Sequence, residues 1–230
     1  MKKRKSIWTV CLLILLIPAL ILSASVLFAQ KYYALISLLV AVLACIPLFY
    51  AFERRESTAT ELAVLAVLIA LCVLGRFLFA WLPGFKPVTA LTIIAAVMLG
   101  REAGFVVGAL SAVVSNFYFG QGPWTPFQMF AWGLIGFCAG VLRGPLKKHR
   151  GLLLCFGAIS GVLYSMTMDV WTTLWAHGSF HLARYAAYAL SALPVTVEYA
   201  VSNVIFLWLL ARPIGEKLAR IQTKYGLFLT

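Results

Sequence analysis

Charged residues are scarce in this sequence. They make up 11% of its 230 residues, and only 7 residues are Asp or Glu. Soluble domains carry about 25% charged residues. A surface that faces water cannot be built from so few charges, so lipid must cover much of this protein. No segment is long or polar enough to form a separate soluble domain.

Cysteines at metal-binding or redox spacing are also missing. The sequence has no CxxC motif, and its 5 cysteines are isolated and lie mostly inside apolar runs: Cys11, Cys45, Cys72, Cys138 and Cys155. This pattern predicts neither a metal site nor a disulfide framework. We expect these residues to act as small apolar side chains within the protein or against lipid.

Motifs for nucleotide hydrolysis and catalysis are missing as well. The chain has no GxxxxGK[ST] loop to hold ATP phosphates and no HExxH zinc motif. Residues 157–161 read Gly-Ala-Ile-Ser-Gly, which is not the GxSG spacing of an intramembrane serine protease. The sequence therefore predicts a protein that is not an enzyme and has no cofactor. An integral-membrane enzyme stays as an alternative, although His149, His177 and His181 form no catalytic constellation.

Long apolar runs fill most of the chain, which is 63% hydrophobic. A helix that crosses the hydrocarbon core of about 30 Å needs about 20 apolar residues. We predict an all-α, polytopic membrane protein. Its expected spans cover residues 7–29, 33–52, 60–82, 86–100, 103–119, 126–142, 152–175 and 185–211, of which the fourth is short.

Basic residues are distributed unevenly between the loops of these spans. The net charge is +12, which in a soluble protein would suggest a nucleic-acid partner, but here the basic residues lie in membrane loops and no such partner is expected. With the N-terminus inside, the outer loops hold only Lys31, Lys86 and Arg184, and Arg76 lies within a span. All other Lys and Arg lie inside. The asymmetry predicts a multi-pass cell-membrane protein with both termini in the cytoplasm.

The chain changes in character at residues 53–60. The first span follows a basic segment, as a secretory signal does, but its apolar run exceeds the usual core of about 7–15 residues and no good cleavage site follows, so we expect an uncleaved anchor. Residues 1–56 are predicted to form a two-helix membrane hairpin. Residues 57–215 are predicted to form a six-helix substrate-binding core, and residues 216–230 a basic cytoplasmic tail.

A stripe of small residues lies along the first helix of the core. It consists of Ala59, Ala63, Ala66 and Ala70, whose spacing places them on one helix face. Small residues let another helix approach closely in lipid. The stripe fits a partner interface and packing within the same protein about equally well.

The expected outer loop at residues 116–128 is rich in aromatic, amide, Gly and Pro residues. Its candidate ligand contacts are Asn116, Tyr118, Gln121, Trp124 and Gln128. Aromatic faces and amides suit a planar, polar small molecule. The alternative is an aromatic belt that anchors two helices at the membrane interface. A belt accounts for the aromatic residues better than for the glutamines.

The last two spans contain polar residues that lipid would not tolerate. Ionisable groups inside a membrane usually face the bundle interior or water, so these residues are candidates to line an outward-facing pocket with Arg76. The candidate contacts are Asp169, Trp171, Trp175, Glu198, Tyr199 and Asn203, with Lys86 in an outer loop. One alternative is a salt bridge from Arg76 to Glu198 or Asp169 that locks the bundle. Another is a stand-alone secondary transporter that uses Asp169 or Glu198 as proton carrier, although no internal repeat is evident.

Five segments of the core together resemble a known family. They are the alanine-rich run 61–70, Lys86-Pro87-Val88-Thr89-Ala90, the glycine-containing run 104–109, the aromatic loop 116–128 and Trp132-Gly133-Leu134-Ile135-Gly136. With these segments, residues 57–215 resemble the substrate-binding S component of an energy-coupling factor (ECF) vitamin transporter. The loop 116–128 carries most of the specificity, and the two additional N-terminal spans depart from the family pattern.

The resemblance implies a mechanism and partners. An S component captures a vitamin at its outer face and then docks on a transmembrane coupling subunit with two ATPases, so this chain would be one subunit of an ABC-type importer. The AxxxA pattern that contacts the coupling subunit in the family matches Ala59/Ala63 and Ala66/Ala70. Cobalamin is the leading expectation for the substrate, because a large ligand suits the many outer aromatic residues. Riboflavin and a queuosine precursor are alternatives.

Overall fold

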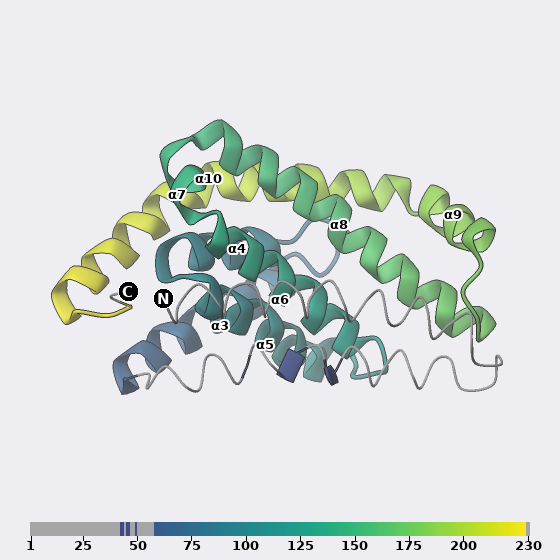
Figure 1. The fold of residues 1–230 in the computed structure, drawn as a ribbon, viewed down its shortest axis with the longest axis horizontal. Helices are drawn as coiled ribbons and strands as arrows, with labels where there is room; N and C mark the ends of the chain where they lie inside the picture. Colours follow the sequence, from purple (N-terminus) through teal and green to yellow (C-terminus); the bar gives the residue numbers. More distant parts are fainter. Residues whose placement is uncertain (1–41, 44, 47–48, 50–57, 229–230) are drawn as a thin grey trace, which may run out of the picture.

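The computed structural model describes residues 42–43, 45–46, 49 and 58–228. Residues 58–228 form α-helices and no strand, which confirms the all-α prediction. The helices are α3 (Ala59–Leu78), α4 (Val88–Leu99), α5 (Arg101–Phe119), α6 (Thr125–Val141), α7 (Arg143–Lys148), α8 (Arg150–His177), α9 (Leu182–Ser191) and α10 (Leu193–Tyr225) (Figure 1). The predicted N-terminal hairpin lies almost wholly outside the described residues.

Helix α3 begins at a capping box and buries only one of its faces. The Thr58 side chain accepts a hydrogen bond from the Glu61 backbone, and the Glu61 side chain accepts one from the Thr58 backbone. Leu65, Leu68 and Cys72 lie on the buried face. The opposite face carries the alanine stripe, so the helix is packed against the bundle on one side alone.

Helix α4 is the centre of the bundle. Of its 12 residues only Met98 is not buried, and the helix contacts α3, α5, α6, α7, α8 and α10. At about 1.5 Å per residue it is about 18 Å long, which is too short to cross the hydrocarbon core alone. The short fourth span predicted at residues 86–100 is confirmed as a short apolar helix.

Glycines bring α5 and α6 into close contact, and this is the most extensive helix pair. A side chain at Gly108 would meet the backbone of Trp132, and Gly104 and Gly136 lie directly against each other. Such close backbone approach is the usual way for helices to associate in lipid. Helices α3, α5, α8 and α10 are long and apolar enough to cross a membrane, and α4 and α6 are shorter apolar helices.

Helices α8 and α10 lie side by side along the molecule (Figure 1). The last predicted span, at 185–211, was wrong in its boundaries, because the structure divides it. Helix α9 ends at Ser191, and α10 begins at Leu193 with Pro194 in its first turn, a position where proline starts a helix. Helix α9 has no buried residue, and α10 continues through Tyr225 into the segment predicted as a basic tail.

The end of α10 returns to the start of the core. The Phe228 backbone N–H donates to Glu61 Oε1 over 2.6 Å, and Gln222 Nε2 donates to the Met98 carbonyl over 3.0 Å. We call this the basic end, defined by residues 143–150 and 212–228. The opposite end, defined by residues 79–87 and 119–125, is called the loop end. By the predicted topology the loop end faces outward.

Candidate functional site

Arg76 lies near the loop end of α3 and points into the bundle. Its Nη1 donates hydrogen bonds to Ser115 Oγ and, over 2.8 Å, to Asn116 Oδ1. The guanidinium carbon lies 4.6 Å from the ring centroid of Phe119 and 5.2 Å from that of Trp132. These contacts, which include cation–π interactions, hold the guanidinium between α3, α5 and α6.

No described carboxylate forms an ion pair with Arg76. The ion pairs found between described residues join Arg101 to Glu102 and Arg212 to Glu216. The locking salt bridge from Arg76 to Asp169 or Glu198, weighed as an alternative from the sequence, is therefore not observed. The charge of Arg76 is balanced by hydrogen-bonding dipoles and aromatic rings instead.

A buried chain of hydrogen bonds leads from Arg76 to α8. Asn116, which is fully buried, donates from Nδ2 to Thr125 Oγ1 over 2.9 Å and to Gln128 Oε1 over 2.7 Å. Gln128 Nε2 in turn donates to the Tyr164 hydroxyl over 3.2 Å. The turn at residues 120–124 folds the start of α6 back on the end of α5, which brings together two predicted contacts, Asn116 and Gln128.

Three aromatic rings continue this chain. Trp132 and Tyr164 stack with 4.8 Å between centroids and 8° between planes, and the Tyr199 ring stands edge-on to Tyr164 at 5.1 Å. Trp132 and Tyr164 are 4% and 3% exposed. The three rings join α6, α8 and α10 in one rigid wall.

A cavity of about 50 Å³ lies against this wall, and we call it the polar cavity. It is lined by Arg76, Lys86, Val88, Thr89, Gln128, Trp132, Tyr164 and Tyr199. Of the predicted binding residues, Lys86, Gln128 and Tyr199 line it, and Asn116 supports it from behind. Sequence reasoning missed Trp132 and Tyr164. Trp132 follows Gln128 by four residues and so shares its helix face, a signal that was available.

The loop between α3 and α4 covers one side of the polar cavity. Gly84 N–H donates to Glu198 Oε2 over 2.9 Å. Ser202 Oγ accepts from the Lys86 backbone N–H at 2.9 Å and donates to the Lys86 carbonyl at 3.1 Å. Buried backbone groups outside helices need such partners. Glu198 and Ser202, four residues apart on α10, thus hold this loop in place.

Lys86 carries the second cationic group of the cavity. Its Nζ donates to the Pro83 carbonyl over 2.6 Å. Burial and the nearby positive charge of Arg76 lower the pKa of Lys86 below its ordinary value, against a smaller opposing effect of Glu198. Two cations therefore face the same small space.

The other predicted contacts lie elsewhere. Trp171 packs on Phe127 at 5.1 Å and on Trp175 at 5.0 Å, in a separate small cluster against which Trp124 also packs. Asp169 is a buried residue of the same helix, α8, and does not line the polar cavity. Trp175 and Tyr118 are largely exposed, and Tyr118 lies on the Phe77 ring. Gln121 stabilises its own loop, because it donates a hydrogen bond to the Val113 carbonyl and accepts one from Thr125. Asn203 donates to the Gly157 carbonyl and joins α10 to α8.

The alanine stripe lies on the exposed face of α3. Ala59, Ala63, Ala66 and Ala70 are all exposed in the described structure. Beside them is a shallow apolar hollow of about 680 Å³, lined by Ala66, Ile69, Ala70, Val73, Leu74, Phe77 and Val114. The stripe therefore does not pack against the described helices.

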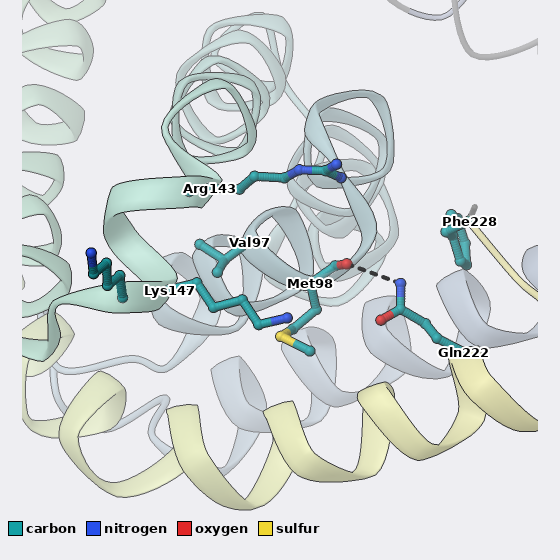
Figure 2. A pocket seen from close by; sticks show the side chains of 8 residues that line it. Val97, Met98, Arg143, Lys147, Gln222 and Phe228 are labelled. Atoms are coloured by element: carbon teal, nitrogen blue, oxygen red, sulfur yellow. Dashed lines mark hydrogen bonds between the residues drawn. The ribbon is translucent and has the colours of Figure 1, made fainter. Parts of the chain in front are cut away.

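A larger cavity lies at the basic end, away from the polar cavity. It has a volume of about 710 Å³ and is lined by Val97, Met98, Arg143, Gly144, Lys147, Lys148, Gln222 and Phe228. Figure 2 shows Arg143 and Lys147 reaching toward the end of α4, where Gln222 holds the Met98 carbonyl. It lies at the end that the predicted topology places in the cytoplasm, so it is not a candidate for capture from outside.

Comparison with known families identifies one match. The model of a family described as ECF-type riboflavin transporter, S component, matches residues 56–220. This match covers the polar cavity, the alanine stripe and all of the helices from α3 to α9. Comparison with curated proteins and with solved structures gives no match.

Proposed function

Since this chain belongs to the family of S components of ECF-type riboflavin transporters, we propose that it captures a vitamin-like small molecule at its loop end for import. The family is one of transporter components and not of enzymes. Riboflavin, which the family description names, and cobalamin, which suits the many aromatic residues, are the substrates to test first. Binding itself requires no ATP.

The polar cavity is the observation that carries this proposal. It places two cations, an amide and three aromatic side chains around one small space near the end of the bundle. A hydrogen-bond chain through Asn116 joins three of these residues, Arg76, Gln128 and Tyr164. Small-molecule sites are typically apolar and aromatic pockets into which a small number of polar groups point. A packing core would have no need of these groups, whose burial is costly.

The present shape of the cavity points to a closed form. Small-molecule sites usually measure about 300–1,000 Å³, and the polar cavity measures about 50 Å³. A vitamin therefore requires the loop 79–87 to move. Its hydrogen bonds to α10 run through the side chains of Glu198 and Ser202, and its Phe79 and Phe85 rings pack on Phe206 of α10. Opening would break these three hydrogen bonds and separate the rings.

Delivery requires partners, because the chain has no nucleotide-binding loop. We propose that a transmembrane coupling subunit docks on the alanine stripe and that two ATPases drive release. The exposure of all four alanines supports this, since a helix face used for packing against the other described helices would be buried.

Ligand binding by the purified full-length protein tests the function. In lipid nanodiscs without ATP, we expect saturable binding of riboflavin or cobalamin, or of another member of a vitamin panel. Gln128→Ala should weaken that binding at least about tenfold, because it removes a buried polar contact and breaks the chain to Tyr164. Asn203→Ala is the matched control, because it removes a buried amide that lies outside the cavity. No binding across the panel would contradict the proposal.

Asp169 supports a second candidate function. It is 9% exposed, and no described residue donates a hydrogen bond to its carboxylate. A stand-alone secondary transporter would use such a group as a proton carrier. The test is uptake into vesicles that contain this chain and no ATPase. Proton-driven uptake that is lost in Asp169→Asn would favour this function over capture for an ATP-driven partner.

A further inference from the structure

Two residues that line the polar cavity, Arg76 and Trp132, have N–H groups without an acceptor among the described residues. Both described hydrogen bonds of Arg76 leave from Nη1, so its Nε and Nη2 have no acceptor among the described residues. Trp132 Nε1 is buried and has no hydrogen-bond partner among the described residues. A buried donor without a partner carries a free-energy cost unless a ligand or water satisfies it.

The hydroxyl and amide groups of the wall do not supply these acceptors. Gln128 Oε1 is already bonded to Asn116, and the Tyr164 oxygen already accepts from Gln128. No hydrogen bond within the described structure uses the proton of the Tyr164 or the Tyr199 hydroxyl. The charged and N–H groups of the cavity thus act as donors, and the Thr89 and Tyr199 hydroxyls can also donate to a ligand.

The charge of the residues around the cavity also favours an anionic ligand. Arg76 and Lys86 line it, and Glu198, the nearest carboxylate to act on Lys86, is exposed and bonded to the Gly84 backbone. The positive charges of Arg76 and Lys86 repel each other, and an anion bound in the cavity would offset this repulsion. The free Nε–Nη2 edge of Arg76 has the planar fork that binds a carboxylate or phosphate through two parallel bonds.

We propose that the polar cavity is an oxyanion subsite, which holds a carboxylate or phosphate group of the captured molecule against Arg76, Lys86 and Trp132. The volume fits this assignment, because one water needs about 10–15 Å³ on the same measure, so that about 50 Å³ holds a few heavy atoms. The remainder of the molecule would lie toward the loop 79–87. This inference rests on the proposed capture function and specifies the chemistry of its ligand.

Matched pairs of molecules that differ only in this group test the subsite. The probes are FMN and riboflavin for phosphate, and biotin with biotin amide and pantothenate with pantothenol for carboxylate. The dissociation constant of each is measured with the full-length protein in nanodiscs. In the pair that binds most tightly, we expect the anionic member to bind at least about tenfold more tightly, the effect of a charge-assisted hydrogen bond.

Variants then assign the preference to the cavity. Arg76→Gln should abolish the difference between anionic and neutral members, and Arg76→Lys should keep only part of it, because the fork is lost. Arg150→Gln is the matched control, since Arg150 also lies over a tryptophan ring, that of Trp208, but outside the cavity. Trp132→Phe removes the N–H and keeps a smaller aromatic ring against Tyr164, and it should weaken the anionic member several-fold more than the neutral member.

The outcomes separate the two proposals. Equal or tighter binding of the neutral members would overturn the oxyanion subsite and leave the capture function standing. No binding in any pair, by protein whose thermal unfolding is normal, would overturn the capture function and the subsite with it. If Arg76→Gln does not fold, Arg76→Lys and Trp132→Phe decide, and an unchanged anionic preference in both would overturn the subsite.

Discussion

Asn116 connects more of the site than any other single residue described. It accepts from Arg76 and donates to Thr125 and Gln128, although the sequence suggested only a loop residue that might contact ligand. Its position at the end of α5 makes it a support for the cavity wall. A residue of this kind acts on binding by holding its neighbours in place.

Truncation of Asn116 should therefore destabilise the fold strongly. Asn116→Ala removes one hydrogen bond from each of three partners, of which Thr125 and Gln128 are buried and Arg76 is half-buried. We expect a loss of about 2 kcal/mol or more. Asn203→Ala is the matched control, because Asn203 is equally buried but has one described bond, to the Gly157 carbonyl. Its loss should be about 1 kcal/mol. Thermal unfolding in the same detergent compares the two, and equal shifts would contradict the role given to Asn116.

Lys86 makes anion binding depend on pH. Burial and Arg76 lower its pKa, so its positive charge is present at low pH and is lost as pH rises through a value below the ordinary pKa of about 10.4. Affinity for the anionic member of a ligand pair should fall over that range, while affinity for the neutral member should not. Lys86→Arg should remove the dependence, because arginine stays charged. Titrations of both members across alkaline pH measure this.

At the scale of helices, the sequence predicted the elements better than their contacts. The apolar runs located α3, α4, α5, α6 and α8, because a period of apolar residues is a local property. The boundary between α9 and α10 was missed, although Pro194 is a helix-start signal. Hydropathy alone did not separate an exposed short helix from the longer helix that follows it.

The sequence named only some of the residues that line the polar cavity. Loop position and residue type identified Lys86, Gln128 and Tyr199, which line the polar cavity. Tyr164 was missed, because it stands in an apolar run and joins the site only through the packing of α8 on α6 and α10. Contacts between distant helices depend on tertiary packing that no local pattern encodes.

The alanine stripe on α3 gives a prediction at the same scale. Ala63→Trp and Ala66→Trp should abolish uptake by cells that contain the whole transporter and leave ligand binding by the purified chain unchanged. A bulky side chain prevents close approach of a partner helix without touching the cavity. Leu71→Trp is the control, since Leu71 is exposed but lies about 100° around the helix from Ala70. Normal uptake in both alanine variants would show that no partner docks there.

At the scale of the whole molecule, the two ends of the bundle differ in chemistry. The loop end has aromatic side chains and the polar cavity, and the basic end has Arg143, Lys147 and Lys148 around a second cavity. The capture function requires the loop end to face outward. The positive-inside rule predicts that orientation independently, because it uses only the loop charges.

Orientation can be measured with two histidines at opposite ends of α8. His149 precedes this 28-residue helix at the basic end and His181 follows it, and both are exposed. At about 1.5 Å per residue the helix is about 42 Å long, so the two positions lie on opposite sides of a membrane. In intact cells, a membrane-impermeant maleimide should label His181→Cys, whereas His149→Cys should react only after permeabilisation, each compared with the parent protein to correct for its native cysteines. Labelling of His149→Cys alone in intact cells would reverse the topology and place the polar cavity on the cytoplasmic side, where it could not capture a molecule from outside.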